Sequence, residues 1–249
     1  MSKAIVKARR FMIKYRKKKE WESSAVVDIL YKTKNAVVIY KPSGIPSQSD
    51  PSGDPNAMTL TSEKLKALGE KGDLWLIHRL DRVVGGLIVF ARNKKYAALL
   101  SEYVKERLLT KEYFAVVDGD AESARLENLI YRDARAGKAF IVDRERQGVK
   151  DARLSYEKLS AKETERGTKT LIRVSLETGR FHQIRAQLSH IKHPITGDGK
   201  YGSKDKTSGI ALMAAHLAIS LPGETIDVSR LPDTDTYPWS LFEREEYKL

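Results

Sequence analysis

Cysteine is absent from this 249-residue sequence. Disulfide bonds and thiolate metal sites are therefore excluded, and with them a secreted scaffold held together by disulfides. No stretch of about 18 apolar residues occurs, and no apolar segment precedes Trp21, so the sequence predicts neither a membrane-spanning helix nor a secretory signal peptide. We expect a cytoplasmic protein, with an organelle transit peptide as the alternative that the basic N-terminus leaves open.

Acidic side chains are missing from residues 1–19, which carry nine lysines and arginines. This segment supplies most of the net charge of +12, because the rest of the sequence holds 36 basic and 33 acidic residues. We interpret residues 1–22 as a basic arm attracted to a polyanion such as nucleic acid, and residues 23–249 as one domain. A solvated tail without a partner is the alternative interpretation of the arm.

Apolar runs in the rest of the sequence alternate with short turns. Val26–Leu30 and Ala36–Tyr40 predict a hairpin, Thr59–Leu68 predicts a short helix, and Leu87–Arg92 predicts a strand followed by a helix that Asn93 caps. Further strands are expected at Lys111–Val117, Ala152–Leu159, Thr170–Leu176 and Ile210–Leu221, with a hairpin before Lys150 and a short helix over Arg180–His190. Strands outnumber helices, so we expect an α+β domain with a mixed, largely antiparallel sheet and flanking helices.

The tetrapeptide His78-Arg79-Leu80-Asp81 stands just before the apolar run that begins at Gly85. It places a carboxylate beside two potential cations at the entrance of a buried strand. An aspartate in this position is usually a turn or capping residue, because its side chain bonds nearby backbone N–H groups. On these residues alone, the turn role is favoured over a chemical one.

A second polar segment, Thr178–Arg185, begins the short helix expected in the second half of the sequence. As a helix, Arg180–Ile191 has one apolar face with Arg185 at its edge, while His182 points away from that face. A partly buried guanidinium needs an anionic partner, and Asp81 is the candidate for a planar bidentate pair that would also lower the pKa of the aspartate. A surface arginine extended over the core is the alternative.

The start of this helix also suits a phosphate group. Gly179 and Arg180 would offer backbone N–H groups and a cation there, although Thr-Gly before a helix is equally ordinary turn chemistry. Four potential metal ligands in this region show no recognised zinc spacing, namely His182, His190, His193 and Asp198. The phosphate-loop pattern GxxxxGK[ST] is absent as well, so we expect neither a catalytic metal nor a nucleotide cofactor.

Five segments of the sequence, taken in order, resemble motifs of the RluA-type family of RNA pseudouridine synthases. These segments are Tyr40–Gly44, His78–Asp81, Lys111–Gly119, Thr178–Arg185 and His193–Asp198. The resemblance implies the pseudouridine synthase fold with a central cleft. Two positions depart from the family pattern: Val84 stands where threonine is usual, and Met213 stands where relatives often have histidine.

The resemblance also implies roles for individual residues. Asp81 would be the nucleophile, Tyr113 would pack on the target base and move a proton, and Arg185 would pair with Asp81. Without the resemblance, Tyr113 would be interpreted as a half-buried packing residue of a strand. The residues expected to contact RNA are Arg79, which would help to displace the target uridine, Arg82, Arg180, His182 and Gln183.

The implied reaction converts uridine to pseudouridine in ribosomal RNA or tRNA, and we expect a monomer without any cofactor, because no electrons move and no group enters. A catalytically silent RNA-binding protein or RNA chaperone on the same fold is the first alternative, which the intact Asp81, Tyr113 and Arg185 oppose. A metal-dependent nuclease is the second alternative, which the missing ligand pattern disfavours.

Overall fold

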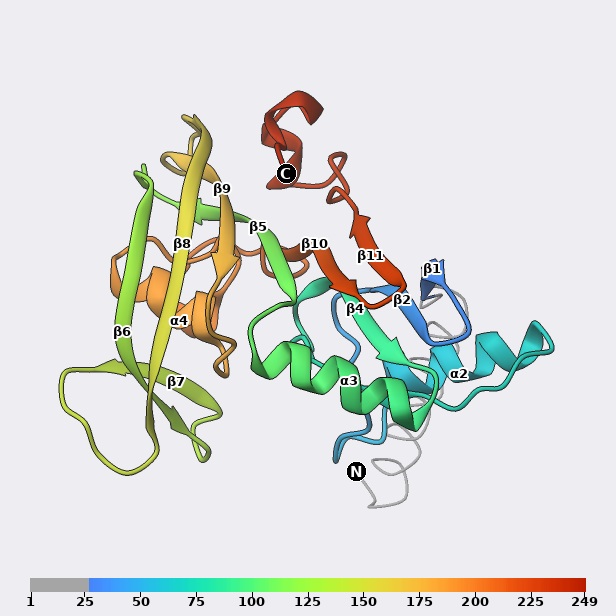
Figure 1. The fold of residues 1–249 in the computed structure, drawn as a ribbon. Helices are drawn as coiled ribbons and strands as arrows, with labels where there is room; N and C mark the ends of the chain where they lie inside the picture. The colour runs from blue at the N-terminus through green and yellow to red at the C-terminus, as the bar shows by residue number, and fades with distance from the viewer. Residues whose placement is uncertain (1–26) are drawn as a thin grey trace, which may run out of the picture.

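The computed structural model describes residues 27–249 and arranges them around one sheet of eleven strands (Figure 1). The expected basic arm lies outside the described residues. The elements in chain order are β1 (Asp28–Lys32), β2 (Ala36–Lys41), α2 (Ala57–Ala67), β3 (Trp75–Leu76), β4 (Gly85–Ala91), α3 (Lys94–Lys105), β5 (Thr110–Asp118), β6 (Ala124–Asp133), β7 (Lys138–Val142), β8 (Val149–Lys162), β9 (Lys169–Leu176), α4 (Gln183–His190), β10 (Leu212–Leu221) and β11 (Glu224–Ser229).

The strands follow the order β1-β2-β4-β10-β5-β9-β8-β6-β7, with β3 pairing with β4 and β11 pairing with β10. Within the described residues, β4 and β10 form the parallel pair and the other strand pairs are antiparallel. The predicted α+β fold with a mixed, largely antiparallel sheet is therefore confirmed.

Strand β4 is buried along its whole length because helices cover both of its faces. Leu87 and Val89 pack with Leu100 of α3, while Ile88 and Phe90 pack on the side of α2. A strand covered on both faces needs apolar side chains at every position, which is why its sequence reads as a continuous apolar run. The predicted cap of α3 is also present, since the Asn93 side chain accepts a hydrogen bond from the Tyr96 N–H.

The second half of the sheet carries α4 on one face and the C-terminal segment on the other. Tyr113 and Phe114 are neighbours in β5, so their side chains point to opposite faces. Tyr113 lies on the face of Ile184 from α4, and the ring of Phe114 meets Tyr247 edge to face with centroids 5.3 Å apart. The C-terminal segment thus closes the core behind the face that carries Tyr113.

Two details differ from the expectations. Helix α4 begins at Gln183 and not at Arg180, because His182 adopts a left-handed backbone conformation with φ of 53°. Strand β11, at Glu224–Ser229, was not predicted from the sequence. Its pattern is weak, since Ile226 is the one fully buried residue of six.

The two halves of the sheet meet where β4 runs beside β10. Gly85 and Gly86 lie opposite Met213 and Ala214 in this short parallel pair. Gly86 has a φ of 126°, and a Cβ atom added there would lie 2.3 Å from the carbonyl oxygen of Ala214. Only glycine allows the two backbones to approach this closely.

We expect the substitution Gly86→Ala to destabilise the protein by several kcal/mol, of the order that overpacking and backbone strain together impose. Gly167→Ala is the matched control, because Gly167 also has a positive φ of 86° but has no atom within 4 Å of an added Cβ. The measurement is the free energy of unfolding in urea. Equal losses in the two variants would show that the β4–β10 contact tolerates a side chain.

Candidate active site

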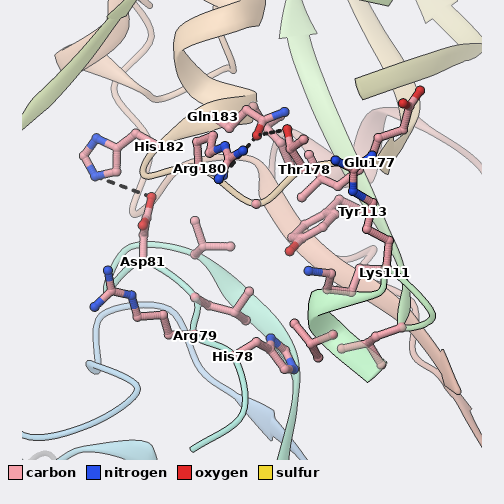
Figure 2. Close-up of a pocket in the computed structure, with 18 of the residues that line it drawn as sticks. His78, Arg79, Asp81, Lys111, Tyr113, Glu177, Thr178, Arg180, His182 and Gln183 are labelled. Carbon is pink, nitrogen blue, oxygen red and sulfur yellow. Dashed lines mark hydrogen bonds and ion pairs between the residues drawn. The ribbon is translucent and has the colours of Figure 1, made fainter. Parts of the chain in front are cut away.

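A cleft of about 550 Å³ opens where the two halves of the sheet meet (Figure 2). Residues 77–81 and Val84, which precede β4, line one wall, and the start of β5 together with residues 176–180 and 182–184 lines the facing wall. The volume lies within the range of small-molecule sites and is large enough for a nucleotide.

Asp81 reaches this cleft from the loop before β4. The chain turns here through its backbone, because the Asp81 carbonyl accepts the Val84 N–H at 3.1 Å. The side-chain bond to a backbone N–H that the turn role implies is not found among the described residues, where the Asp81 carboxylate accepts from Arg185. Ser47 holds the same loop by accepting the Leu80 N–H at 3.0 Å and donating to the Leu80 carbonyl at 2.8 Å. The carboxylate is left to face the cleft, with 25% of the side chain exposed.

Arg185 lies beneath this carboxylate and is almost fully buried. Its Nη1 donates to Oδ2 of Asp81 at 3.3 Å, so the expected pairing is present. The expected bidentate geometry is wrong, however, because Nε and Nη2 donate to Asp198 at 2.6 and 2.9 Å. The guanidinium also lies over the ring of Tyr201, 4.9 Å from its centroid. Asp198 therefore holds the arginine in place, and the one remaining nitrogen faces Asp81.

The pKa of Asp81 is raised above its ordinary value, which also differs from expectation. Burial of the carboxyl is the largest cause, and the nearby Arg185, Lys41 and Arg79 oppose it without cancelling it. A buried charge is costly even when a cation is close. The ionised carboxylate is therefore higher in free energy than a solvent-exposed one, and this favours its reaction with an electrophile.

His182 contacts Asp81 from the other side. Its Nε2 lies 3.5 Å from Oδ2 of Asp81, and its ring stacks on Phe181 with centroids 3.8 Å apart. Burial, together with the positive charges of Arg185 and other cations, lowers the pKa of His182 to about 3, so the ring is neutral. The hydroxyl of Tyr201 accepts the Ala139 N–H at 2.8 Å and lies 2.9 Å from Nδ1 of His182. If the hydroxyl donates to Nδ1, the remaining ring proton is on Nε2 and points at Asp81.

Tyr113 and Lys111 lie on the wall that faces Asp81 (Figure 2). Burial and the charge of Asp81 raise the pKa of Tyr113, so its hydroxyl is protonated at neutral pH. Burial lowers the pKa of Lys111. Lys111 was not among the expected site residues, although the strand alternation places it on the same face as Tyr113.

The loop of Asp81 rests on a buried lysine that sequence reasoning also missed. The Nζ of Lys41 donates to the carbonyls of Ile45 at 2.8 Å, Pro42 at 3.0 Å and Arg82 at 3.3 Å. Burial lowers the pKa of Lys41 to about 7, against the opposing attraction of Asp81. The Lys-Pro pair in the sequence was the available signal, but only the fold shows that Lys41 supports the loop of Asp81.

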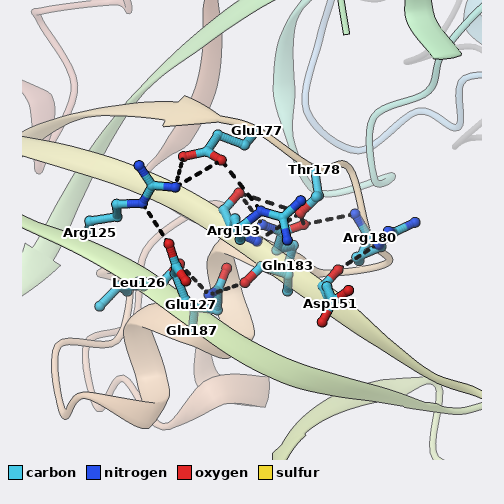
Figure 3. Close-up of polar contacts among 11 residues, drawn as sticks. Arg125, Leu126, Glu127, Asp151, Arg153, Glu177, Thr178, Arg180, Gln183 and Gln187 are labelled. Carbon is cyan, nitrogen blue, oxygen red and sulfur yellow. Dashed lines mark hydrogen bonds and ion pairs between the residues drawn. The ribbon is translucent and has the colours of Figure 1, made fainter. Parts of the chain in front are cut away.

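Two of the expected RNA contacts have other partners. Arg82 donates to Asp54 at 2.7 Å and to Asp50 at 2.8 Å, and it does not line the cleft. Gln183 is buried, its carbonyl accepts from Thr178 at 2.8 Å, and its amide donates to the Arg153 carbonyl at 3.0 Å (Figure 3). Both side chains hold loops through these contacts, and of the two only Gln183 lines the cleft.

The turn before α4 is likewise closed by Gln183. Its carbonyl accepts the backbone N–H of Arg180 at 3.0 Å, so this N–H does not point at a phosphate as the sequence suggested. The Arg180 side chain does line the cleft, as do those of Arg79 and His182. Gln183 also lines the cleft, so four of the five expected RNA contacts lie in the same cleft as Asp81.

The described residues 27–249 contain neither a metal-binding cluster nor a membrane-spanning helix. In that range no three histidine, aspartate or glutamate side chains are grouped to hold a metal ion. Over the same range, no helix has the length and apolar character needed to cross a membrane.

Comparison with known proteins identifies the class to which this fold and site belong. The family described as RNA pseudouridylate synthase matches residues 35–190. A human structure, RNA pseudouridylate synthase domain containing 1, superposes with a TM-score of 0.71 at 23% identity over 86% of each chain, which shows the same fold. This chain belongs to the RluA-type family of RNA pseudouridine synthases.

Individual relatives differ in their RNA. The ribosomal large subunit pseudouridine synthase D of Borreliella burgdorferi is 30% identical over 191 residues, which are 74% of this chain and 57% of that protein. The tRNA pseudouridine synthase C of Haemophilus ducreyi is 32% identical over 189 residues, which are 71% of this chain and 74% of that protein. The chain thus spans little more than half the length of several curated relatives that it matches.

We expect the pKa of Asp81 to rise further in the variant Arg185→Met, because that substitution removes the nearest opposing cation while burial remains. The carboxyl carbon of Asp81 can be titrated by ¹³C NMR in both proteins. Asp50 is the internal reference, since hydrogen bonds from Ser52 and Arg82 hold its pKa at about 2 and Arg185 does not contribute to it. An unchanged Asp81 midpoint in the variant would contradict the coupling between Asp81 and Arg185.

The raised pKa of Asp81 also makes the stability of the folded protein depend on pH. Because the folded pKa of Asp81 is raised, the folded protein binds more protons than the unfolded chain between the ordinary value and the raised one. Stability should therefore fall as the pH rises through that window. The difference in unfolding free energy between the wild type and Asp81→Asn, measured in urea across the acidic range, should show this slope. Carboxyls with lowered pKa values, such as Asp50, contribute the opposite slope, but they contribute it equally to both proteins.

Proposed function

We propose that this protein is an RNA pseudouridine synthase that isomerises uridine to pseudouridine in ribosomal RNA or tRNA, with Asp81 as the nucleophile. One observation carries the proposal. The Asp81 carboxylate faces a nucleotide-sized cleft while Arg185, itself held by Asp198, contacts it from below.

The reaction fits the groups in the cleft. The bond between C1′ of the ribose and N1 of the base breaks, the base turns, and a new bond joins C1′ to C5. The C5 proton is then lost and N1 gains a proton, so no electrons or external groups are needed. A carboxylate can hold either the sugar or the base during the turn. Tyr113, on the facing wall, is the group proposed to pack on the base and to move a proton.

Access to the target requires that the base leave its stack. Flipping a nucleotide out of a helix costs roughly a few kcal/mol, and stacking on an aromatic side chain offsets about 1–3 kcal/mol of this. Arg79, Arg180 and His182 line the cleft and are proposed to contact the displaced strand and its phosphates. Arg82 and Gln183 are omitted from this set because of their internal contacts.

The departures at Val84 and Met213 do not alter this assignment. Both side chains are buried and pack in the cluster of apolar residues around β5 and β10. Neither position supplies a polar group to Asp81, Tyr113 or Arg185. The silent RNA-binding alternative is therefore less well supported than the enzyme.

The proposal is completed by expectations from the sequence about domains, oligomeric state, location and cofactor. Residues 1–22 act as a basic arm for RNA, and residues 23–249 form the catalytic domain. The protein works as a monomer in the cytoplasm, without a nucleotide cofactor.

The test is pseudouridine mapping of total RNA from cells that lack the gene, after incubation with the purified protein. We expect new pseudouridine at discrete positions with the wild type and none with Asp81→Asn, which keeps the size of the side chain but removes the anionic nucleophile. RNA affinity should stay largely unchanged in the variant, because phosphate contacts dominate it. Turnover by Asp81→Asn at a near wild-type rate would refute the nucleophile, and cleaved RNA would indicate a nuclease.

Removal of residues 1–19 should weaken RNA binding and reduce its salt dependence. Each phosphate contact contributes a log–log slope of about 0.7 to 0.9, so the loss of nine cations should be visible in a salt titration of affinity. The maximal rate at saturating RNA should change little, since the residues that line the cleft begin far later in the chain. An unchanged affinity and slope would show that the arm has no part in binding.

A further inference from the structure

A second hollow of about 220 Å³ adjoins the active cleft. The two share Arg79, Gly179 and Arg180 in their linings, so a chain that occupies the cleft passes directly by the hollow. The additional lining includes Arg132 and Lys150. Nothing in the proposed reaction uses these last two side chains.

The register of the sheet places Arg132 and Lys150 on one face. Arg132 of β6 lies opposite Ala139 of β7, and Lys150 of β8 lies opposite Ile130 of β6. Ile130 and Arg132 are two positions apart in the same strand, so all of these side chains point to the same side of the sheet. This is the side that α4 covers, since Ile130 and Ala139 pack with Ala186.

The charged residues that line the hollow are all basic. Arg79, Arg132, Lys150 and Arg180 come from four separate segments and converge there. Among the described residues, no carboxylate lies within 4 Å of any of them, whereas Arg125, on the opposite face of β6, pairs with Glu127 at 2.8 Å. The rest of the described chain is nearly balanced in charge, so four cations without a carboxylate partner at one place create a local positive potential that attracts an anion.

The cations are oriented in ways that leave hydrogen-bond donors available. The guanidinium of Arg132 lies over the ring of Phe181, 4.5 Å from its centroid. A cation–π contact uses the face of the guanidinium and leaves the in-plane N–H groups for a ligand. The Nε of Arg180 donates to the Asp151 carbonyl at 2.8 Å, which fixes the side chain while its terminal nitrogens remain. Such planar donors match the oxygens of a phosphate group.

We propose that this hollow is a phosphate-binding subsite for the RNA backbone directly next to the target uridine. The assignment rests on the proposed function for the identity of the polymer, and on the geometry of the hollow for the phosphate. Arg132 and Lys150 are its dedicated cations, and Arg79 and Arg180 connect it to the cleft. The subsite would hold the strand in register while the base is displaced.

The experiment measures affinity for the oligonucleotide (rU)12 as a function of salt concentration. Every uridine of this probe that enters the cleft has a neighbouring phosphate, so the binding register does not matter. The test variant is the double substitution Arg132→Gln with Lys150→Gln, and both side chains are exposed, so the fold should tolerate the change. The matched control is Lys34→Gln with Lys95→Gln, which removes the same charge from exposed positions that line neither the cleft nor the hollow.

We expect the log–log slope of the test variant to be lower by about 0.7 or more, the contribution of one phosphate contact on a single strand, with weaker binding at low salt. The control should keep the wild-type slope and affinity. A test variant that binds as the wild type does, or a control that loses as much, would overturn the subsite. Thermal unfolding of each variant verifies that the fold is retained.

The outcome is separable from that of the proposed function. If the wild type makes no pseudouridine in total RNA but the test variant still loses slope on (rU)12, the reaction is refuted and the phosphate subsite stands. If the wild type makes pseudouridine and the two double variants bind alike, the reaction stands and the subsite is refuted.

Discussion

The short parallel contact between β4 and β10 is the constraint on which the rest of the structure depends. Asp81 belongs to the half of the sheet that ends in β4, and Arg185 belongs to the half built around β5, β9 and β8. The close approach of Gly86 to Ala214 joins these halves, and the apolar cluster that β10 and β11 form with β4 and α3 supports the contact. A side chain at Gly86 would separate the backbones, and the site would be displaced together with the sheet.

The site itself depends on the sharing of one buried cation. Arg185 has two carboxylate partners. Two of its nitrogens donate to Asp198, and the third donates to Asp81. This division leaves Asp81 only partly compensated, which is consistent with a pKa raised by burial despite the neighbouring cations. A fully paired carboxylate would be more stable and less reactive, so the incomplete pairing agrees with the role of nucleophile proposed for Asp81.

Several polar residues near the cleft have a supporting task that their position in a motif does not reveal. Lys41 ties together the carbonyls beneath the loop of Asp81, and Gln183 closes the turn before α4. Buried polar groups must be hydrogen-bonded, so such residues are as strongly constrained by their environment as those that react. Their sequence pattern alone does not separate the two tasks, whereas the direction of each hydrogen bond does.

The sequence by itself determined the class of fold and most of its elements. Apolar runs such as Leu87–Arg92 and the Asn93 cap are local signals, because periodicity and capping act within a few residues. The motif around Asp81 and the one around Arg185 likewise indicated the family. The arrangement of Arg185 between Asp81 and Asp198, the left-handed backbone of His182 and the pairing of weakly patterned β11 with β10 were decided only by the tertiary structure. These features depend on contacts between distant segments and on burial. The local pattern of residues predicts neither the long-range contacts nor the burial.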